Sequence, residues 1–172
     1  DQNVTTDVGD VQVDGNVNSE GTIDSAGSVE VTGTSGVGGN VTSVDEQVYT
    51  GAVTLTAPVT FTGNDRDSDG EAIDFGSTVS GGGNNMTVTG GVGFADVVSG
   101  VDDLVADTID SESTIDAATV NVSGTSDLGG NVTTSGDQTF SGNVTLTDNV
   151  ELDGANLNLG GDIDGSHNLI LD

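Results

Sequence analysis

Three aspartates stand at alternate positions before a glycine in the stretch GNDRDSDGEAID, residues 63–74. Side-chain oxygens from Asp65, Asp67 and Asp69 at this spacing can converge on a hard cation such as Ca²⁺. Gly70 permits the sharp backbone turn that such a loop requires. The residue types and their spacing therefore predict a calcium-binding loop.

Two more residues of this stretch extend the calcium hypothesis. Glu71 would add a backbone carbonyl ligand, and Asp74 would add a carboxylate. An EF-hand flanked by helices is not expected, because the twelfth position of a loop that begins at Asp65 is Gly76 rather than Glu. The alternative is a solvated surface turn in which Arg66 pairs locally, and the residue types alone leave both interpretations open.

The charge balance restricts the partners of the chain. Its 172 residues include 29 acidic residues and one Arg or Lys, Arg66, which gives a formal net charge of −28. Nucleic acid is excluded as a partner because phosphate binding requires clustered Lys or Arg, and anionic membrane surfaces are disfavoured for the same reason. Self-repulsion of this size requires screening by cations or salt, so we expect a saline or calcium-rich setting. Acidity that serves solubility is the alternative.

Several kinds of segment are missing from the sequence. It contains no Cys, which removes disulfides and thiolate metal sites and fits an exposed protein. No apolar run approaches the ~18 residues that cross a bilayer, so membrane insertion is not expected. The opening residues DQNVTTDVGD contain neither a basic region nor an apolar signal core, as in a processed mature chain or an excised segment.

An internal repeat organises the chain. Its clearest copies are residues 28–90 and 119–172, which align without a gap over their first part at a shift of 91 positions. Apolar positions stay apolar between the copies, as where Tyr49 becomes Phe140. The second copy has no counterpart of the aspartate loop, so we expect this loop to be an insertion that projects from a turn.

Apolar residues alternate with Thr, Asn, Ser or Asp in both copies, for example in Val53-Thr54-Leu55 and Val144-Thr145-Leu146. A period of two predicts strands, while Gly, Asn and Asp supply the turns between them. Strands this short suit either a sandwich or a solenoid, and the ungapped repeat favours a solenoid because each coil contacts only its neighbours. We expect an all-β fold in a single domain over residues 1–172. Its architecture would be a right-handed parallel β-helix of about seven to nine coils with about 20 residues each.

The stretch NVTTSGDQTFSGNVTL, residues 131–146, matches a repeat pattern of large secreted bacterial surface proteins. It meets every position of N-V-T-T-x-G-D-Q-T-[YF]-x-G-x-V-T-L, and residues 40–55 match the pattern more loosely. Over residues 28–172 the chain resembles the filamentous-haemagglutinin-like adhesins. The resemblance implies a right-handed β-helical stalk at the cell surface that serves adhesion or a structural role, and it brings no catalytic residues with it.

Other residues admit further interpretations. Asp102-Asp103, or Asp162 with Asp164, could supply the two carboxylates of a polysaccharide hydrolase and His167 a general base, but aromatic sugar platforms and basic residues are scarce. Alternating threonines in VTLTAPVTFTG suggest ice binding, although Thr also suits exposed strand positions. Six Asn-x-Ser/Thr acceptor sequences are present, at Asn3, Asn40, Asn85, Asn121, Asn131 and Asn143.

These observations favour a non-catalytic, extracellular structural protein at the cell surface. We expect an adhesin stalk or the subunit of a self-assembling filament. The calcium hypothesis assigns Asp65, Asp67, Asp69, Glu71 and Asp74 as ligands, and the solvated turn remains its alternative. Further copies joined end to end are the expected partners, because NLILD at residues 168–172 is a strong apolar strand and a parallel β-helix exposes strand edges at its ends. A host-surface or polysaccharide receptor is a second expected partner. The alternative functions are a polysaccharide-acting β-helix enzyme and an ice-binding β-solenoid.

Overall fold

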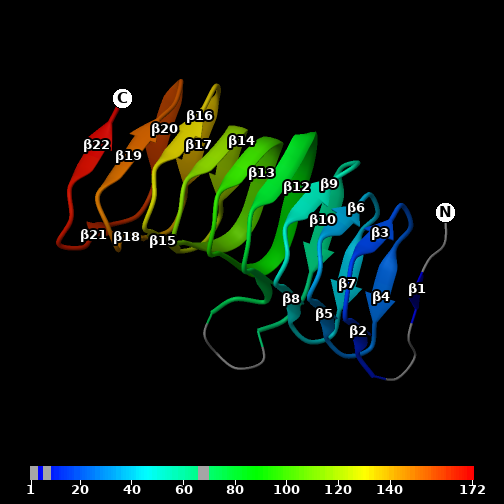
Figure 1. Ribbon diagram of the computed structural model, residues 1–172. Helices are drawn as coiled ribbons and strands as arrows, with labels where there is room; N and C mark the ends of the chain where they lie inside the picture. Colours follow the sequence, from blue (N-terminus) through cyan, green and yellow to red (C-terminus); the bar gives the residue numbers. More distant parts are fainter. Residues whose placement is uncertain (1–3, 6–8, 66–69) are drawn as a thin grey trace.

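The structure, a computed structural model, describes residues 4–5, 9–65 and 70–172. In these residues the chain forms 22 strands and no helix. The strands pair in parallel and stack as a β-solenoid of about nine turns that runs from one end of the molecule to the other (Figure 1). The predicted all-β parallel solenoid is confirmed, and the number of turns falls within the predicted range.

Each strand pairs with the equivalent strands of the coils before and after it, and the strands form three columns that we call the first, second and third faces. The first face contains β1 (Val4–Thr5), β4 (Ile23–Ser25), β7 (Val41–Ser43), β10 (Val59–Thr62), β17 (Asp137–Phe140) and β20 (Asn156–Leu159). The second face contains β2 (Val11–Val13), β5 (Val29–Val31), β8 (Gln47–Tyr49), β11 (Ile73–Phe75), β15 (Ser126–Leu128), β18 (Val144–Leu146) and β21 (Ile163–Asp164). The third face contains β3 (Val17–Ser19), β6 (Ser35–Val37), β9 (Val53–Leu55), β16 (Val132–Thr134), β19 (Val150–Asp153) and β22 (Leu169–Leu171). Three longer strands turn the corners and contribute to more than one face: β12 (Val79–Phe94), β13 (Val98–Ser111) and β14 (Ile115–Val122).

The coils of the N-terminal part are regular. They advance by 18 residues, since Val11 pairs with Val29 and Val29 with Gln47. Strands there begin every six residues, so a coil consists of three six-residue units, each a strand and a turn. The coil that carries the aspartate loop is longer, because Gln47 pairs with Ile73, a step of 26 residues. The loop is therefore an insertion into a regular coil, as the repeat predicts, and that regular coil is slightly shorter than predicted.

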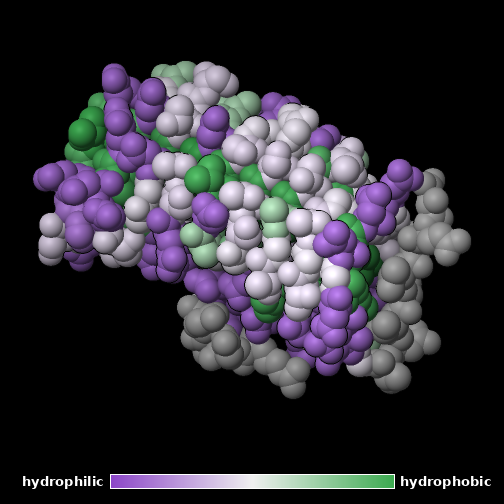
Figure 2. All heavy atoms as spheres, viewed as in Figure 1, coloured by the Kyte–Doolittle hydropathy of each residue, from purple (hydrophilic) through white to green (hydrophobic). Residues whose placement is uncertain are grey.

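Alternation within the strands separates the core from the surface. In most short strands the first and third residues point inward, as in β5, where Val29 and Val31 are 0% and 1% exposed. β-branched side chains favour the extended backbone, and the small polar residues favour the turns. On the side seen in Figure 2, hydrophilic and neutral residues cover most of the surface.

Four of the five aromatic side chains gather in one part of the core, which elsewhere is mainly aliphatic. Tyr49, Phe75 and Phe94 lie in successive coils of the second face, with ring centroids 5.2 and 5.5 Å apart. Phe61 meets Tyr49 and Phe75 edge-on at 5.8 and 5.3 Å. Phe61 and Phe75 also flank the insertion in the sequence, so this aromatic cluster packs the coil from which the loop departs.

The two copies of the internal repeat lie on different faces. Gln47 begins β8 on the second face, whereas its counterpart Gln138 lies in β17 on the first face. Local geometry is nevertheless preserved, because Val41 pairs with Phe61 and the counterpart Val132 pairs with Leu152, both at a step of 20 residues. The second copy is therefore rotated by one face, a third of a turn, around the solenoid axis.

Candidate functional site

The predicted calcium loop connects β10 on the first face to β11 on the second face. The Oδ2 atom of Asp65 accepts a hydrogen bond of 3.0 Å from the backbone N–H of Gly70, which closes the loop at its base. Asp67 and Asp69 lie outside the described residues, as does Arg66. The structure therefore places only Asp65, Glu71 and Asp74 of the predicted ligands.

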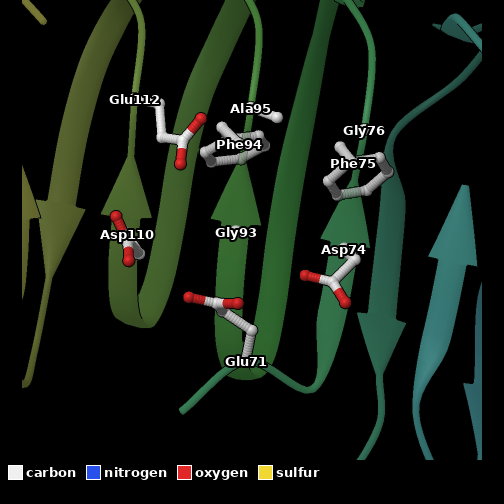
Figure 3. Close-up of a pocket in the computed structure, with 9 residues that line it drawn as sticks. All are labelled: Glu71, Asp74, Phe75, Gly76, Gly93, Phe94, Ala95, Asp110 and Glu112. Atoms are coloured by element: carbon white, nitrogen blue, oxygen red, sulfur yellow. The ribbon is translucent and has the colours of Figure 1, made fainter. Parts of the chain in front are cut away.

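Glu71 and Asp74 line a surface hollow of about 240 Å³ beside the aromatic cluster, together with Asp110 and Glu112. Figure 3 shows the side chain of Glu71 between those of Asp74 and Asp110. Gly93 makes room for it, because a Cβ added at this glycine would lie 3.1 Å from Cδ of Glu71 and 2.9 Å from Oδ1 of Asp74. The missing side chain at Gly93 thus lets a residue of the loop lie across the second face.

Strand register explains why these carboxylates meet. Asp74 pairs with Gly93, Gly93 with Asp110, and Asp110 with Asp127, so they form one outward column along the second face. Glu71, Asp110 and Asp127 also border a smaller hollow of about 80 Å³. Asp110, Glu112 and Asp127 were not predicted as members of this group, because neighbours in adjacent coils are identified only once the register is known.

Asp110 is a carboxyl group whose titration this arrangement changes. Burial raises the pKa of Asp110, the hydrogen bond with Glu71 lowers this pKa, and the charges of Asp127 and Glu112 raise it, with a net increase. A group of acidic side chains like this one retains protons and attracts cations. Within the described residues, however, no three His, Cys, Asp or Glu side chains are placed to hold one metal ion together.

Two of the residues considered for hydrolysis, Asp103 and Asp164, accept hydrogen bonds from nearby residues. Asp103 accepts hydrogen bonds from Nδ2 of Asn85 at 3.3 Å and from Oγ1 of Thr119 at 2.8 Å. Asp164 accepts a bond of 2.7 Å from the N–H of Gly165, and His167 is exposed in the turn before β22. Asp102 and Asp162 are exposed.

The threonines considered for ice binding form a short array on the first face. Thr60 pairs with Thr87 and Thr62 with Thr89, which gives two aligned rows in adjacent coils. The next coil interrupts the array, because Thr87 pairs with Val105, which is 38% exposed.

Several asparagines of the acceptor sequences occupy corners of the solenoid, immediately before a strand. There the side-chain oxygen accepts a hydrogen bond from a backbone N–H of the next coil: Asn40 from Thr60 at 3.0 Å, Asn131 from Glu151 at 2.9 Å and Asn143 from Asp162 at 3.1 Å. Asp10, Asn16 and Asn149 make equivalent bonds outside these sequences. We call these six residues the corner acceptors, and each ties its own coil to the next.

The fold defines this chain as a parallel β-solenoid repeat protein. Comparisons with protein-family models, curated proteins and solved structures find no match. Across the part of the chain that the structure describes, no helix has the length and apolar character needed to span a membrane.

Proposed function

We propose that this chain is a non-catalytic structural protein of the cell surface, either an adhesin stalk or the subunit of a self-assembling filament. Support for its extracellular location comes from the resemblance to filamentous-haemagglutinin-like repeats, from the acidic surface and from the absence of Cys. A solenoid suits this role because its length grows by the addition of coils while its cross-section stays constant.

One observation carries the filament proposal: apolar side chains are exposed on the last coil. Ile163 and Leu171 are 44% and 53% exposed, although Val144 and Leu152 at the equivalent inward positions of the preceding coil are buried. Ile170, at an outward position, is 56% exposed. Hydrophobic residues are also visible at the C-terminal end of the solenoid in Figure 2. Apolar surface next to strand edges favours association with another β-structure.

Light scattering and electron microscopy test this proposal. In about 0.5 M NaCl, which screens charges beyond a few ångströms, we expect the mass to rise with protein concentration and fibres one solenoid wide to form. The double variant Ile163→Asp/Leu171→Asp should remain monomeric. Val44→Asp is the matched control, because it replaces an exposed valine away from the last coil and should still assemble. A chain that stays monomeric at high concentration would contradict the filament proposal.

A further inference from the structure

We infer that Asp164, which is followed by Gly165, is a site of spontaneous covalent modification at which the aspartate converts to isoaspartate. The two residues lie at the end of β21 and in the turn that leads to β22. The reaction requires neither a cofactor nor an enzyme, and the inference is independent of the proposed function. The second face would thereby acquire a covalent change that accumulates with the age of the protein.

The side chain of Asp164 lies against the nitrogen atom that would attack it. The backbone N–H of Gly165 donates a hydrogen bond of 2.7 Å to Oδ1 of Asp164. This contact brings the adjacent carbon atom, Cγ, close to the same nitrogen, so that a five-membered ring is nearly closed. Groups that the fold already holds in such proximity react faster than groups that must first meet.

The reaction consists of a ring closure and a hydrolysis. The nitrogen of Gly165 bonds to Cγ of Asp164, and the amide proton leaves as water with the hydroxyl of the protonated carboxyl group. Water then opens the resulting succinimide at one of its two carbonyl carbons. Opening at Cγ restores aspartate, whereas opening at the main-chain carbonyl of Asp164 gives isoaspartate, in which the backbone runs through Cβ and Cγ.

Glycine at the following position distinguishes Asp164 from similar aspartates. Asp96 and Asp148 accept the same type of bond from the residues that follow them, at 2.7 and 2.6 Å. Those residues are a valine and an asparagine, whose side chains hinder the approach of the nitrogen to Cγ. Gly165 has no side chain, so the contact at Asp164 is combined with an unhindered nitrogen.

The sequence Asp153-Gly154 offers the same residue types in a different hydrogen-bond arrangement. The N–H of Gly154 donates to the backbone oxygen of Asp172 at 3.1 Å, as part of the contact between two coils. At the other site β21 pairs with β18 only as far as Asp164, and the N–H of Gly165 turns to the side chain instead. We therefore expect Asp153 to react more slowly than Asp164.

Water reaches Asp164 from the outer side of the second face. The side chain of Asp164 is exposed, and so is that of Thr145, its partner one coil earlier. The exposure therefore belongs to the outward position on this face and does not depend on what lies beyond β22.

Isoaspartate would loosen the turn that follows β21. It adds one carbon to the backbone where Gly165 has a φ of +121° and where an added Cβ would collide with the backbone oxygen of Leu146. A longer backbone cannot keep both the pairing of β21 and this close approach. We expect the corner bond from the N–H of Asn168 to Asn149 to weaken as a result.

Storage of the full chain at physiological temperature and mildly acidic pH, where a larger fraction of carboxyl groups is protonated, tests the inference. An isoaspartate-specific methyltransferase with a labelled methyl donor measures the total amount of isoaspartate. Mass spectrometry locates it after digestion with a protease that cleaves before aspartate but not before isoaspartate. We expect isoaspartate to form several-fold faster at Asp164 than at Asp153 in the folded chain. In denaturant, where both contacts are lost, the two rates should become similar.

Two matched variants complete the test. Asp164→Thr and Asp153→Thr each introduce the residue type that the partner one coil earlier already has, Thr145 and Thr133. Asp164→Thr should remove most of the isoaspartate signal of the stored folded chain, whereas Asp153→Thr should leave this signal unchanged. An Asp164 that reacts no faster than Asp153 in the folded chain, or equal signals from the two variants, would overturn the inference. Circular dichroism confirms that both variants are folded.

Discussion

Two buried glutamines show how single side chains hold the coils together. Gln47 and Gln138 are both 0% exposed, at equivalent positions of the two copies. The Nε2 atom of Gln138 donates to the backbone oxygens of Val132 at 2.9 Å and Asp153 at 2.7 Å, so that one amide ties two adjacent coils. Gln47 makes the same pair of contacts and also accepts a bond of 3.1 Å at Oε1 from the hydroxyl of Tyr49.

Phe140→Tyr is expected to stabilise the chain. Phe140 stands where the first copy has Tyr49, and Oε1 of Gln138 has no hydrogen-bond partner among the described residues. The added hydroxyl would supply that partner and raise the free energy of unfolding by about 1 kcal/mol, measured by denaturant titration. Tyr49→Phe is the reverse control and should cost about 1–3 kcal/mol, because it leaves Oε1 of Gln47 buried and unpaired. A destabilising Phe140→Tyr or a stabilising Tyr49→Phe would refute this account.

Asp110→Asn should raise the melting temperature at neutral pH. The pKa of Asp110 is raised first by burial, and Asp127 and Glu112 raise it further against the lowering effect of Glu71. A folded pKa above the unfolded value means that protonation favours the folded state. This stabilisation is complete below the unfolded pKa of about 4 and is lost as the pH rises through the folded pKa.

The difference in melting temperature between the Asp110→Asn variant and the unmodified chain should therefore shrink as the pH falls toward about 4. Thermal melts across this pH range measure it. Asp116→Asn on the third face is the control, since it removes one exposed charge away from Glu71. An equal gain from both variants would attribute the effect to net charge alone.

At the scale of elements, sequence reasoning succeeded where the pattern is local. Alternation at Val53 and Leu55 predicts a strand, and the ungapped repeat predicts stacked coils; both are observed. Contacts between coils could not be predicted from the sequence pattern. The approach of Glu71 to Asp110 depends on a glycine at position 93 and on register along the second face, and the rotation of the second copy depends on the summed lengths of the intervening coils.

Removal of a corner acceptor should loosen one junction between coils. Asn131→Ala deletes the hydrogen bond from the N–H of Glu151 and should lower the free energy of unfolding by about 1 kcal/mol. Asn131→Asp retains an acceptor oxygen and should cost less, since Asp10 serves the same role toward Ser28 at 2.9 Å. Denaturant unfolding at high salt compares the two variants with the added charge screened. Equal losses would show that packing, not the hydrogen bond, is responsible.

The insertion loop should be dispensable for the fold and necessary for any response to calcium. We expect replacement of residues 64–72 by Ala-Asn, the shorter connection of the second copy, to leave the strand signal in circular dichroism unchanged. If the loop binds Ca²⁺, the free energy of unfolding of the full chain should rise by about 2.7 kcal/mol at a free Ca²⁺ concentration of 100 times Kd. The shortened variant should gain nothing, and Mg²⁺ at equal concentration controls for screening. If Ca²⁺ leaves the melting temperature of the full chain unchanged, the calcium prediction is contradicted.

For the whole molecule, net charge governs stability. A formal charge of −28 on 172 residues makes the compact state repel itself. Between about 0.01 and 1 M NaCl the screening length falls from about 30 to about 3 Å, so the melting temperature should rise over this range and then level off. Chloride is preferred to sulfate, which strengthens apolar burial by itself. A melting temperature that does not change with NaCl would mean that the acidic side chains are too far apart to destabilise the fold.

Because the second copy is rotated, the two copies expose their equivalent side chains on different sides of the rod. Similar side chains of the two copies point about 120° apart and lie roughly 20 Å apart along the axis, at the usual strand spacing. A flat surface that contacts one copy cannot contact its twin, whereas two separate molecules could each bind one without colliding. The duplication therefore distributes equivalent epitopes around the circumference, which suits a rod that is approached from several directions.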